Sequence, residues 1–291
     1  GAILKMILYI MIFRDASKMH RKKKKKKKNP FPLPGSMLYK QELNRVSGKN
    51  GLRKHGSFHQ HKERQLKMFE FEDQVIVVTG AAGNLGNAVA KIFLQQNGNV
   101  CGIDHRKGRM EDLENFPTER GKFYPFEEVD VTDDDEMDAL VDKIHDQIGT
   151  IDVLVNTVGG FSMGESVHEM SDQIWQRMID LNVHSFLSTT SAIVPDMIEK
   201  NRGKVISIGS KAALNGSAKT GAYAAAKGAL LRLTESMAEE LKKNSIQVNC
   251  VLPGTIDTPE NRQAMPNSDF STWVSPEQVA KVILFLSSSA S

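Results

Sequence analysis

From Met68 onward, short apolar runs rich in β-branched residues alternate with longer stretches of helical periodicity. Apolar runs bounded by turn residues are typical of strands that are buried on both faces. Their alternation with helices indicates βαβ units with right-handed crossovers, so we expect an α/β fold with a doubly wound parallel sheet. The predicted strands are residues 75–78, 100–103, 123–126, 151–155, 204–208 and 246–252.

The helices are predicted from periodicity and from residues that cap helix ends. Thr132 is expected to cap a helix that runs to residue 148, with aspartates in its first turn, where the helix dipole favours negative charge. Residues 275–278 have the sequence of a capping box and start the last helix. The other predicted helices are residues 84–97, 172–194 and 220–243.

The charge of the chain divides it into two segments. Residues 1–67 hold 19 Lys/Arg and 3 Asp/Glu, whereas residues 68–291 hold 19 basic and 32 acidic residues. The first segment includes a lysine run at residues 22–28 and buries too little apolar surface to offset the entropy of ordering. We therefore predict a disordered basic leader at residues 1–67 and one folded domain at residues 68–291. The alternative is an arm that binds RNA or membrane through phosphate neutralisation, but no aromatic residues are interleaved with the charge.

Two further features indicate the compartment. The apolar stretch at residues 1–13 is shorter than the ~20 residues that a membrane-spanning helix needs, and its positive charge follows it, unlike that of a signal peptide. Cys101 and Cys250 lie inside predicted strands and are interpreted as buried hydrophobic residues, not as a disulfide. No Cys/His cluster has metal-ligand spacing, so no metal site is expected. The sequence thus predicts a cytoplasmic protein without a membrane span.

Residues 79–86, with the sequence Thr-Gly-Ala-Ala-Gly-Asn-Leu-Gly, connect the first strand to its helix. Glycines allow a tight turn and a close approach of backbone N–H groups to a pyrophosphate, while the helix N-terminus attracts negative charge. Asp104 ends the second strand, where a carboxylate accepts hydrogen bonds from the ribose of NAD and repels the 2′-phosphate of NADP. Arg106 follows and is suited to meet such a phosphate. We predict NAD as the cofactor, with NADP less favoured.

Tyr223 and Lys227 stand four residues apart in a predicted helix, which places the phenol and the ammonium on one face. A phenol has an ordinary pKa of about 10. A nearby cation favours the phenolate and lowers this pKa, so the tyrosine can act as a general acid or base. Ser210 follows the fifth strand, and its hydroxyl could hold a substrate oxygen.

Residues 72–286 resemble the short-chain dehydrogenase/reductase family. The motifs that carry the resemblance are the loop at residues 79–86, Asp130-Val131, residues 156–159, Asn182, Ser210, the Tyr223/Lys227 pair and residues 253–258. The resemblance implies a Rossmann-like sheet of order 3-2-1-4-5-6 and hydride transfer between NAD(H) and a carbonyl/alcohol pair. It implies that Tyr223 exchanges the proton and that Lys227 lowers its pKa and binds the nicotinamide ribose. It also implies that Ser210 orients the carbonyl and that Asn182 supports a proton relay through water.

The resemblance also implies where the cofactor binds. Asp130 and Val131 would flank the adenine, Asn156 would steady the adenosine side, and residues 253–258 would wrap the nicotinamide. The implied cofactor-binding residues are Gly80, Gly83, Asn84, Leu85, Gly86, Asp104, Asp130, Val131, Asn156, Gly159, Tyr223, Lys227, Pro253, Gly254, Thr255, Ile256 and Thr258.

The sequence departs from the family pattern in three places. The middle glycine of the family's loop is Asn84 here, and we expect the loop to survive because Asn tolerates left-handed backbone. Residues 156–159 are bulkier than the usual Asn-Asn-Ala-Gly. The chain stops at Ser291, so the family's seventh strand is expected to be missing. That strand helps subunit contacts, so a homo-oligomeric dimer or tetramer is expected if the C-terminus is complete.

The substrate is less constrained. Residues 255–273 are similar to the corresponding stretch of quinonoid dihydropteridine reductase, a divergent family member, which makes quinonoid dihydropteridine a minor substrate hypothesis. The alternative is a short lid that covers an apolar substrate. The alternative function is a non-catalytic dinucleotide-binding or nucleic-acid-binding protein, which would not need an activated phenol. Candidate substrate contacts are Phe161, Leu214, Met265 and Trp273.

Overall fold

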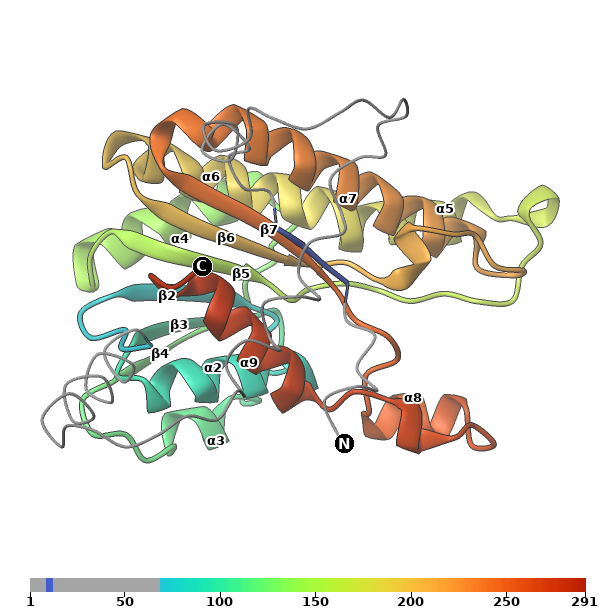
Figure 1. Cartoon of the computed structure of the whole chain (residues 1–291), viewed down its shortest axis with the longest axis horizontal. Coiled ribbons are helices and arrows are strands. Elements are labelled where there is room, and N and C mark those ends of the chain that lie inside the picture. The colour runs from blue at the N-terminus through green and yellow to red at the C-terminus, as the bar shows by residue number, and fades with distance from the viewer. Residues whose placement is uncertain (1–8, 13–68) are drawn as a thin grey trace, which may run out of the picture. The chain divides into compact units, whose positions relative to one another are not determined.

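The computed structural model describes residues 9–12 and 69–291. Its parallel strands follow the order β7-β6-β5-β2-β3-β4 across the sheet, which is the predicted 3-2-1-4-5-6 order read from the other edge (Figure 1). All six predicted strands are confirmed, with ends that differ by at most one residue. Their bounds are β2 (Val75–Thr79), β3 (Asn99–Asp104), β4 (Phe123–Glu127), β5 (Ile151–Asn156), β6 (Gly203–Ile208) and β7 (Ile246–Leu252).

A further strand, β1 (Tyr9–Ile12), was not predicted. It pairs antiparallel with β7, with Tyr9 opposite Leu252 and Ile12 opposite Asn249. Within the described residues no strand follows β7, and β1 pairs along its outer edge. These four residues therefore depart from the prediction of a disordered leader, and the remaining residues of that leader lie outside the described part of the chain.

Helices cover both faces of the sheet (Figure 1). One face is covered by α2 (Asn84–Gln95), α3 (Glu111–Glu114) and α9 (Pro276–Ser287), and the other by α4 (Asp134–Gln147), α6 (Ser185–Glu199) and α7 (Gly221–Glu240). Each layer has its own apolar core, with Phe93 and Ile283 in the first and Met137 and Ile193 in the second. Because the strands are buried on both sides, they form continuous apolar runs in the sequence.

The helix caps confirm one prediction and correct another. At α9, Ser275 and Gln278 form the predicted capping box. At α4, however, the N-cap is Asp133, whose side chain accepts a hydrogen bond from the backbone of Glu136 at 3.0 Å. Thr132 instead donates from its amide and hydroxyl to Asp130, at 2.9 and 2.7 Å. The preceding carboxylate thus competes successfully for the threonine that we expected to cap the helix.

The long helix predicted at residues 172–194 is interrupted. It consists of α5 (Asp172–Ile179), a π-helical segment (Asp180–His184) and α6. Insertions of this kind occur frequently at functional sites. The sequence also did not indicate the short helices α3 and α8 (Pro259–Ala264).

We expect a chain that begins at Met68 to keep the parallel sheet, because all six parallel strands begin after that residue. Removing the antiparallel partner of β7 should lower the melting temperature, by roughly 2–4 °C for each 1 kcal/mol of lost stability. Thermal unfolding followed by circular dichroism, with the full chain as reference, measures this change. Loss of cooperative unfolding in the shortened chain would contradict the prediction.

Candidate active site

The glycine loop is shaped by a backbone contact that excludes side chains. A Cβ atom added to Gly86 would lie 2.1 Å from the carbonyl oxygen of Gly80, so only glycine fits there. Gly80 has a φ of +66°, and its carbonyl accepts from the amide of Gly83 at 2.9 Å. Asn84 is the first residue of α2 and does not use the left-handed backbone that we expected of it. The loop keeps its turn because Gly80 supplies the positive φ.

Asp104 connects this loop to β3. Its carboxylate is 97% buried and accepts a hydrogen bond from the amide of Ala82, in the loop, at 3.1 Å. Arg106 binds the same carboxylate through two nitrogens, at 2.8 and 3.1 Å. Burial alone would raise the pKa of Asp104, but the hydrogen bonds and charge of Arg106, together with the Ala82 amide, hold this pKa below its ordinary value. A buried, ionised carboxylate at this strand end suits a ribose diol.

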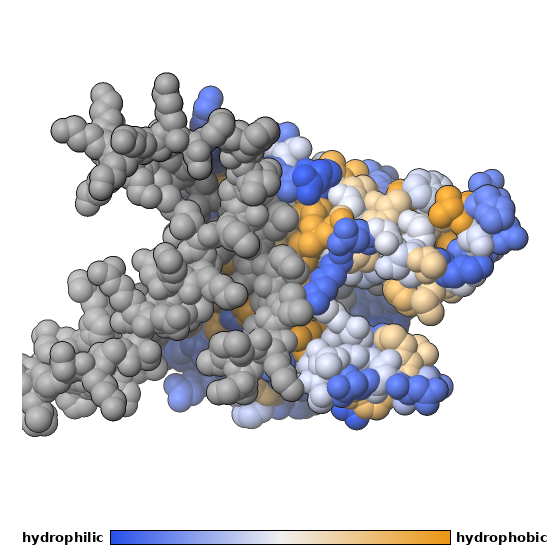
Figure 2. All heavy atoms as spheres, turned by 45° about the vertical axis from the view of Figure 1, so that its right-hand side comes forward, coloured by the Kyte–Doolittle hydropathy of each residue, from blue (hydrophilic) through white to orange (hydrophobic). Residues whose placement is uncertain are grey.

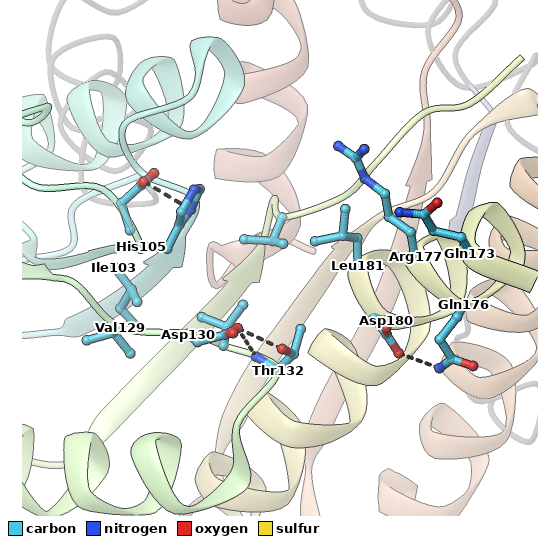
Figure 3. A pocket seen from close by; sticks show the side chains of 14 residues that line it. Ile103, His105, Val129, Asp130, Thr132, Gln173, Gln176, Arg177, Asp180 and Leu181 are labelled. Atoms are coloured by element: carbon cyan, nitrogen blue, oxygen red, sulfur yellow. Dashed lines mark hydrogen bonds and ion pairs between the residues drawn. The ribbon is translucent and has the colours of Figure 1, made fainter.

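A cavity of about 750 Å³ lies beside Asp104, within the size range of small-molecule sites. Figure 3 shows apolar side chains of Ile103, Val129 and Leu181 around it, with the polar side chains of Asp130 and Thr132 on one side. Hydrogen bonds from Thr132 hold the pKa of Asp130 below its ordinary value. Four predicted cofactor residues line the cavity, namely Gly80, Asp104, Asp130 and Val131.

The helix on the opposite side of this cavity was predicted, but the sequence was not seen to place its residues in the site. Gln173 and Arg177 on α5, and Leu181 in the π segment, line it at intervals of four residues (Figure 3). That spacing places three side chains on one helix face and was available as a signal. It was overlooked because polar and apolar residues share the face.

Asn156, the last residue of β5, is buried. Its side chain is 7% exposed, and its oxygen accepts from the hydroxyl of Thr189 on α6 at 3.0 Å. Its amide nitrogen is buried and has no hydrogen-bond partner among the described residues. A buried unpaired donor at the carboxyl end of β5 is costly to the fold and is consistent with a site built for a polar ligand.

The predicted catalytic residues come together at the carboxyl ends of β5 and β6. Tyr223 and Lys227 both lie on α7, and Ser210, just after β6, is close enough to the phenol of Tyr223 to lower its pKa. The amine of Lys227 donates to the carbonyl of Ile208 at 2.8 Å. A Cβ atom added to Gly159 would lie 3.1 Å from that amine and 3.0 Å from the side-chain oxygen of Asn182.

The pKa of Tyr223 differs from our expectation. We expected Lys227 to lower it, but burial raises the pKa of Tyr223, and the hydrogen bond from Ser210 offsets only part of this effect. Burial also lowers the pKa of Lys227 to about 8. The lysine is therefore partly neutral near that pH, which weakens its influence on the phenol.

Asn182 fixes the loop after β5. It lies in the π-helical segment and is 1% exposed. Its amide nitrogen donates to the carbonyls of Met178 and Gly160 at 2.9 and 3.1 Å, and its oxygen accepts from the amide of Gly160 at 3.2 Å. This clamp holds Gly160, and with it the cavity side of the loop, in one position. A role of Asn182 in proton relay stays a prediction.

The segment after β7, residues 253–273, is ordered by its own contacts. Thr258 caps α8, and Arg262 binds Asp257 through two nitrogens at 2.6 and 2.8 Å. The guanidinium of Arg262 also covers the ring of Phe270, which packs edge-on against Trp273 at 4.8 Å. A groove of about 1110 Å³ between α2, α8 and α9 brings together three predicted cofactor residues, Gly83, Asn84 and Thr258.

The candidate substrate residues are distributed unevenly around Tyr223. The ring of Phe161 packs edge-on against Tyr223 at a centroid distance of 5.0 Å and is 60% exposed. Leu214 is exposed in the loop after β6, whereas Met265 and Trp273 are half-buried in residues 253–273. Figure 2, with this end turned forward, shows a hollow between the upper part of the domain and the part below, with hydrophobic side chains exposed near it. Of these four candidate residues, Phe161 is the one whose ring contacts the ring of Tyr223 among the described contacts.

The site fits a dinucleotide, since a loop with three glycines leads into a helix N-terminus and a buried carboxylate stands at the next strand end. The fold and site together define an NAD(P)-dependent oxidoreductase with a Rossmann-like domain. The sequence model described as short chain dehydrogenase matches residues 74–269. The chain belongs to the short-chain dehydrogenase/reductase family.

Known relatives cover most of the domain. A 3-oxoacyl-(acyl-carrier-protein) reductase of Thermotoga maritima is 32% identical over 232 residues, which are 76% of this chain and 92% of the relative. The solved structure of such a reductase from Brucella melitensis with bound NAD has a TM-score of 0.69 and 27% identity, covering 84% of this chain and 92% of that one. The structure of ElxO with bound NADP shares the fold, with a TM-score of 0.68 and 23% identity, and covers 74% of this chain and 92% of that one.

Two absences hold for the part of the chain that the structure describes. Within it, no helix is both long and apolar enough to cross a membrane. No group of three or more His, Cys, Asp or Glu side chains in residues 69–291 could hold a metal ion.

Cys101 and Cys250 are buried and free, as predicted. Burial raises the pKa of the Cys101 thiol to about 12 and that of the Cys250 thiol to about 11.

Substituting Gly86→Ala should weaken NADH binding by an order of magnitude or more, because the added methyl forces the loop away from the start of α2. Overpacking of this kind costs about 1–3 kcal/mol. Fluorescence titration with NADH measures the affinity, and circular dichroism measures the melting temperature.

Gly216→Ala is the matched control for this test, since a Cβ at Gly216 meets nothing within 4 Å and Gly216 has no positive φ. We expect this variant to bind NADH like the original chain. An equal affinity in Gly86→Ala would show that the loop does not contact the dinucleotide.

Proposed function

We propose that this chain interconverts a carbonyl and an alcohol with NAD(H), using Tyr223 as the general acid or base. The observation that carries the proposal is the position of Ser210 beside the phenol of Tyr223, one helical turn from buried Lys227, at the carboxyl edge of the sheet. A single substrate oxygen can accept from both hydroxyls. The bound nicotinamide supplies or accepts the hydride, and the chain supplies position and a proton.

The raised pKa of Tyr223 favours one direction at neutral pH. A protonated phenol is ready to donate to the oxygen of a carbonyl as it becomes an alkoxide, so reduction needs no prior ionisation. Oxidation needs the phenolate, whose fraction increases with pH even though Lys227 loses its stabilising positive charge above a pKa of about 8. We therefore propose that reduction is faster than oxidation at neutral pH and that the rate of oxidation increases as the pH rises.

The surroundings of Tyr223 support an apolar carbonyl compound as the substrate. Phe161 forms an aromatic wall against Tyr223, and Met163 and Leu214 are also exposed in the loops after β5 and β6. The backbone amide of Gly164 donates to the carbonyl of Lys219 at 2.9 Å, which joins these two loops. The relatives named above are not dihydropteridine reductases, so quinonoid dihydropteridine stays a minor hypothesis. A screen of carbonyls, alcohols and quinonoid dihydropteridine, followed by NADH absorbance, distinguishes them.

Tyr223→Phe should lower turnover by a factor of about 10² to 10⁴, which is the usual contribution of a positioned acid, while NADH binding is retained. The measurement is the rate with a substrate from the screen, together with NADH affinity by fluorescence. Tyr124→Phe serves as the control, because Tyr124 lies on β4 and packs against the core on the α4 side. Unchanged turnover in Tyr223→Phe would remove Tyr223 from the mechanism, whereas absence of turnover in the unmodified chain with every compound of the screen would favour a non-catalytic dinucleotide-binding protein.

We further propose that the chain prefers NAD(H) over NADP(H). The buried carboxylate of Asp104 supports this preference, since it suits the ribose hydroxyls and repels a 2′-phosphate. Arg106 is held on Asp104 through two nitrogens, so it is engaged by a carboxylate before any phosphate arrives. Homo-oligomerisation and a cytoplasmic location stay predictions.

Asp104→Ala should reduce the difference between the KM values for NADH and NADPH. The substitution removes the acceptor for the ribose hydroxyls and frees Arg106 to bind a phosphate. Steady-state KM values for NADH and NADPH, measured for both proteins with one substrate, give the comparison. A lower KM for NADPH than for NADH in the unmodified chain would show that Arg106, and not Asp104, decides the preference.

A further inference from the structure

A direct contact joins the segment after β7 to the glycine loop. The carboxylate of Glu260, the second residue of α8, accepts a hydrogen bond from the side-chain amide of Asn84 at 2.8 Å. Asn84 is the residue that stands where the family has its middle glycine, and it begins α2. The two residues are 176 positions apart, so the contact links two separate parts of the site.

Glu260 also places a negative charge beside the glycine loop, where a dinucleotide would bind through its pyrophosphate. Its charge interacts with that of Arg106, whose guanidinium is bound to Asp104. One arginine thus lies within the influence of two carboxylates. The backbone next to Asn84 is the loop that would bind a pyrophosphate, which carries two negative charges.

We propose that Glu260 is a specificity-determining residue that weakens dinucleotide binding by charge and disfavours NADP(H) more than NAD(H). Its carboxylate occupies a hydrogen-bonding position on the glycine loop and repels the pyrophosphate there. The additional 2′-phosphate of NADP(H) lies on the side of Asp104 and Arg106, so it adds further negative charge to the same region. The proposal rests on dinucleotide binding at the glycine loop and not on the role of Tyr223.

Glu260→Gln separates charge from contact. Glutamine keeps an oxygen that can accept from Asn84, so the link between the two segments is retained while the negative charge is lost. Glu260 is exposed, and the substitution should not disturb the core. Circular dichroism confirms that the variant folds.

The experiment is a fluorescence titration of the full-length chain with NADH and with NADPH. In Glu260→Gln we expect the Kd for NADH to fall roughly 3- to 10-fold at low ionic strength, and the Kd for NADPH to fall further, as Coulomb energies at partly solvated sites suggest. The effect should shrink at high salt, because the Debye length falls from about 30 Å at 0.01 M to about 3 Å at 1 M.

Glu239→Gln is the matched control. Glu239 lies at the end of α7 in an exposed ion pair with Lys242 at 3.5 Å, so this variant changes the net charge equally without touching the site. We expect it to leave both Kd values unchanged. An unchanged or higher Kd for NADH in Glu260→Gln would overturn the proposal, and equal tightening for both dinucleotides would overturn its specificity part. The two Kd values measure binding alone, so they are interpreted independently of whether Tyr223→Phe loses turnover.

Discussion

The close approach of Gly86 to the Gly80 carbonyl is the constraint on which the rest of the site depends. It sets the start of α2 directly over the end of β2, which no residue with a side chain permits. Two amides of the same loop then bind β3, from Ala81 to the Ile103 carbonyl at 3.1 Å and from Ala82 to the Asp104 carboxylate. The shape of this loop is therefore fixed by hydrogen bonds to the neighbouring strand.

Buried polar groups of the site are concentrated where strands end. Asp104 and Asn156 are the last residues of β3 and β5, and buried Lys227 binds the last carbonyl of β6. Burial raises the pKa of Tyr223 and lowers that of Lys227, and it leaves one donor of Asn156 without a partner in the described chain. Such groups cost stability, which the apolar cores on both faces of the sheet offset.

The sequence predicted those features that have a local signal. Parallel strands form continuous apolar runs, the glycine loop stands between a strand and a helix, and four-residue spacing joins Tyr223 to Lys227. Antiparallel β1 is four residues long within a basic segment and has no such signal. The competition between Asp130 and the helix for Thr132 depends on two local hydrogen bonds, which the residue types alone do not reveal. The pKa of Tyr223 depends on burial, which a helical spacing does not reveal.

The π-helical segment between α5 and α6 changes the direction in which the side chains of one nearly continuous helix point. A wider turn shifts the angular register of all residues that follow it. Before the insertion, Gln173 and Arg177 face the cavity, and only Met178 of α5 is buried. After it, Phe186 and Ile193 of α6 pack into the core beneath the sheet. A single-residue deletion in the turn would rotate one half against the other by about 100°, so the cavity-facing half and the core-facing half would no longer both be aligned.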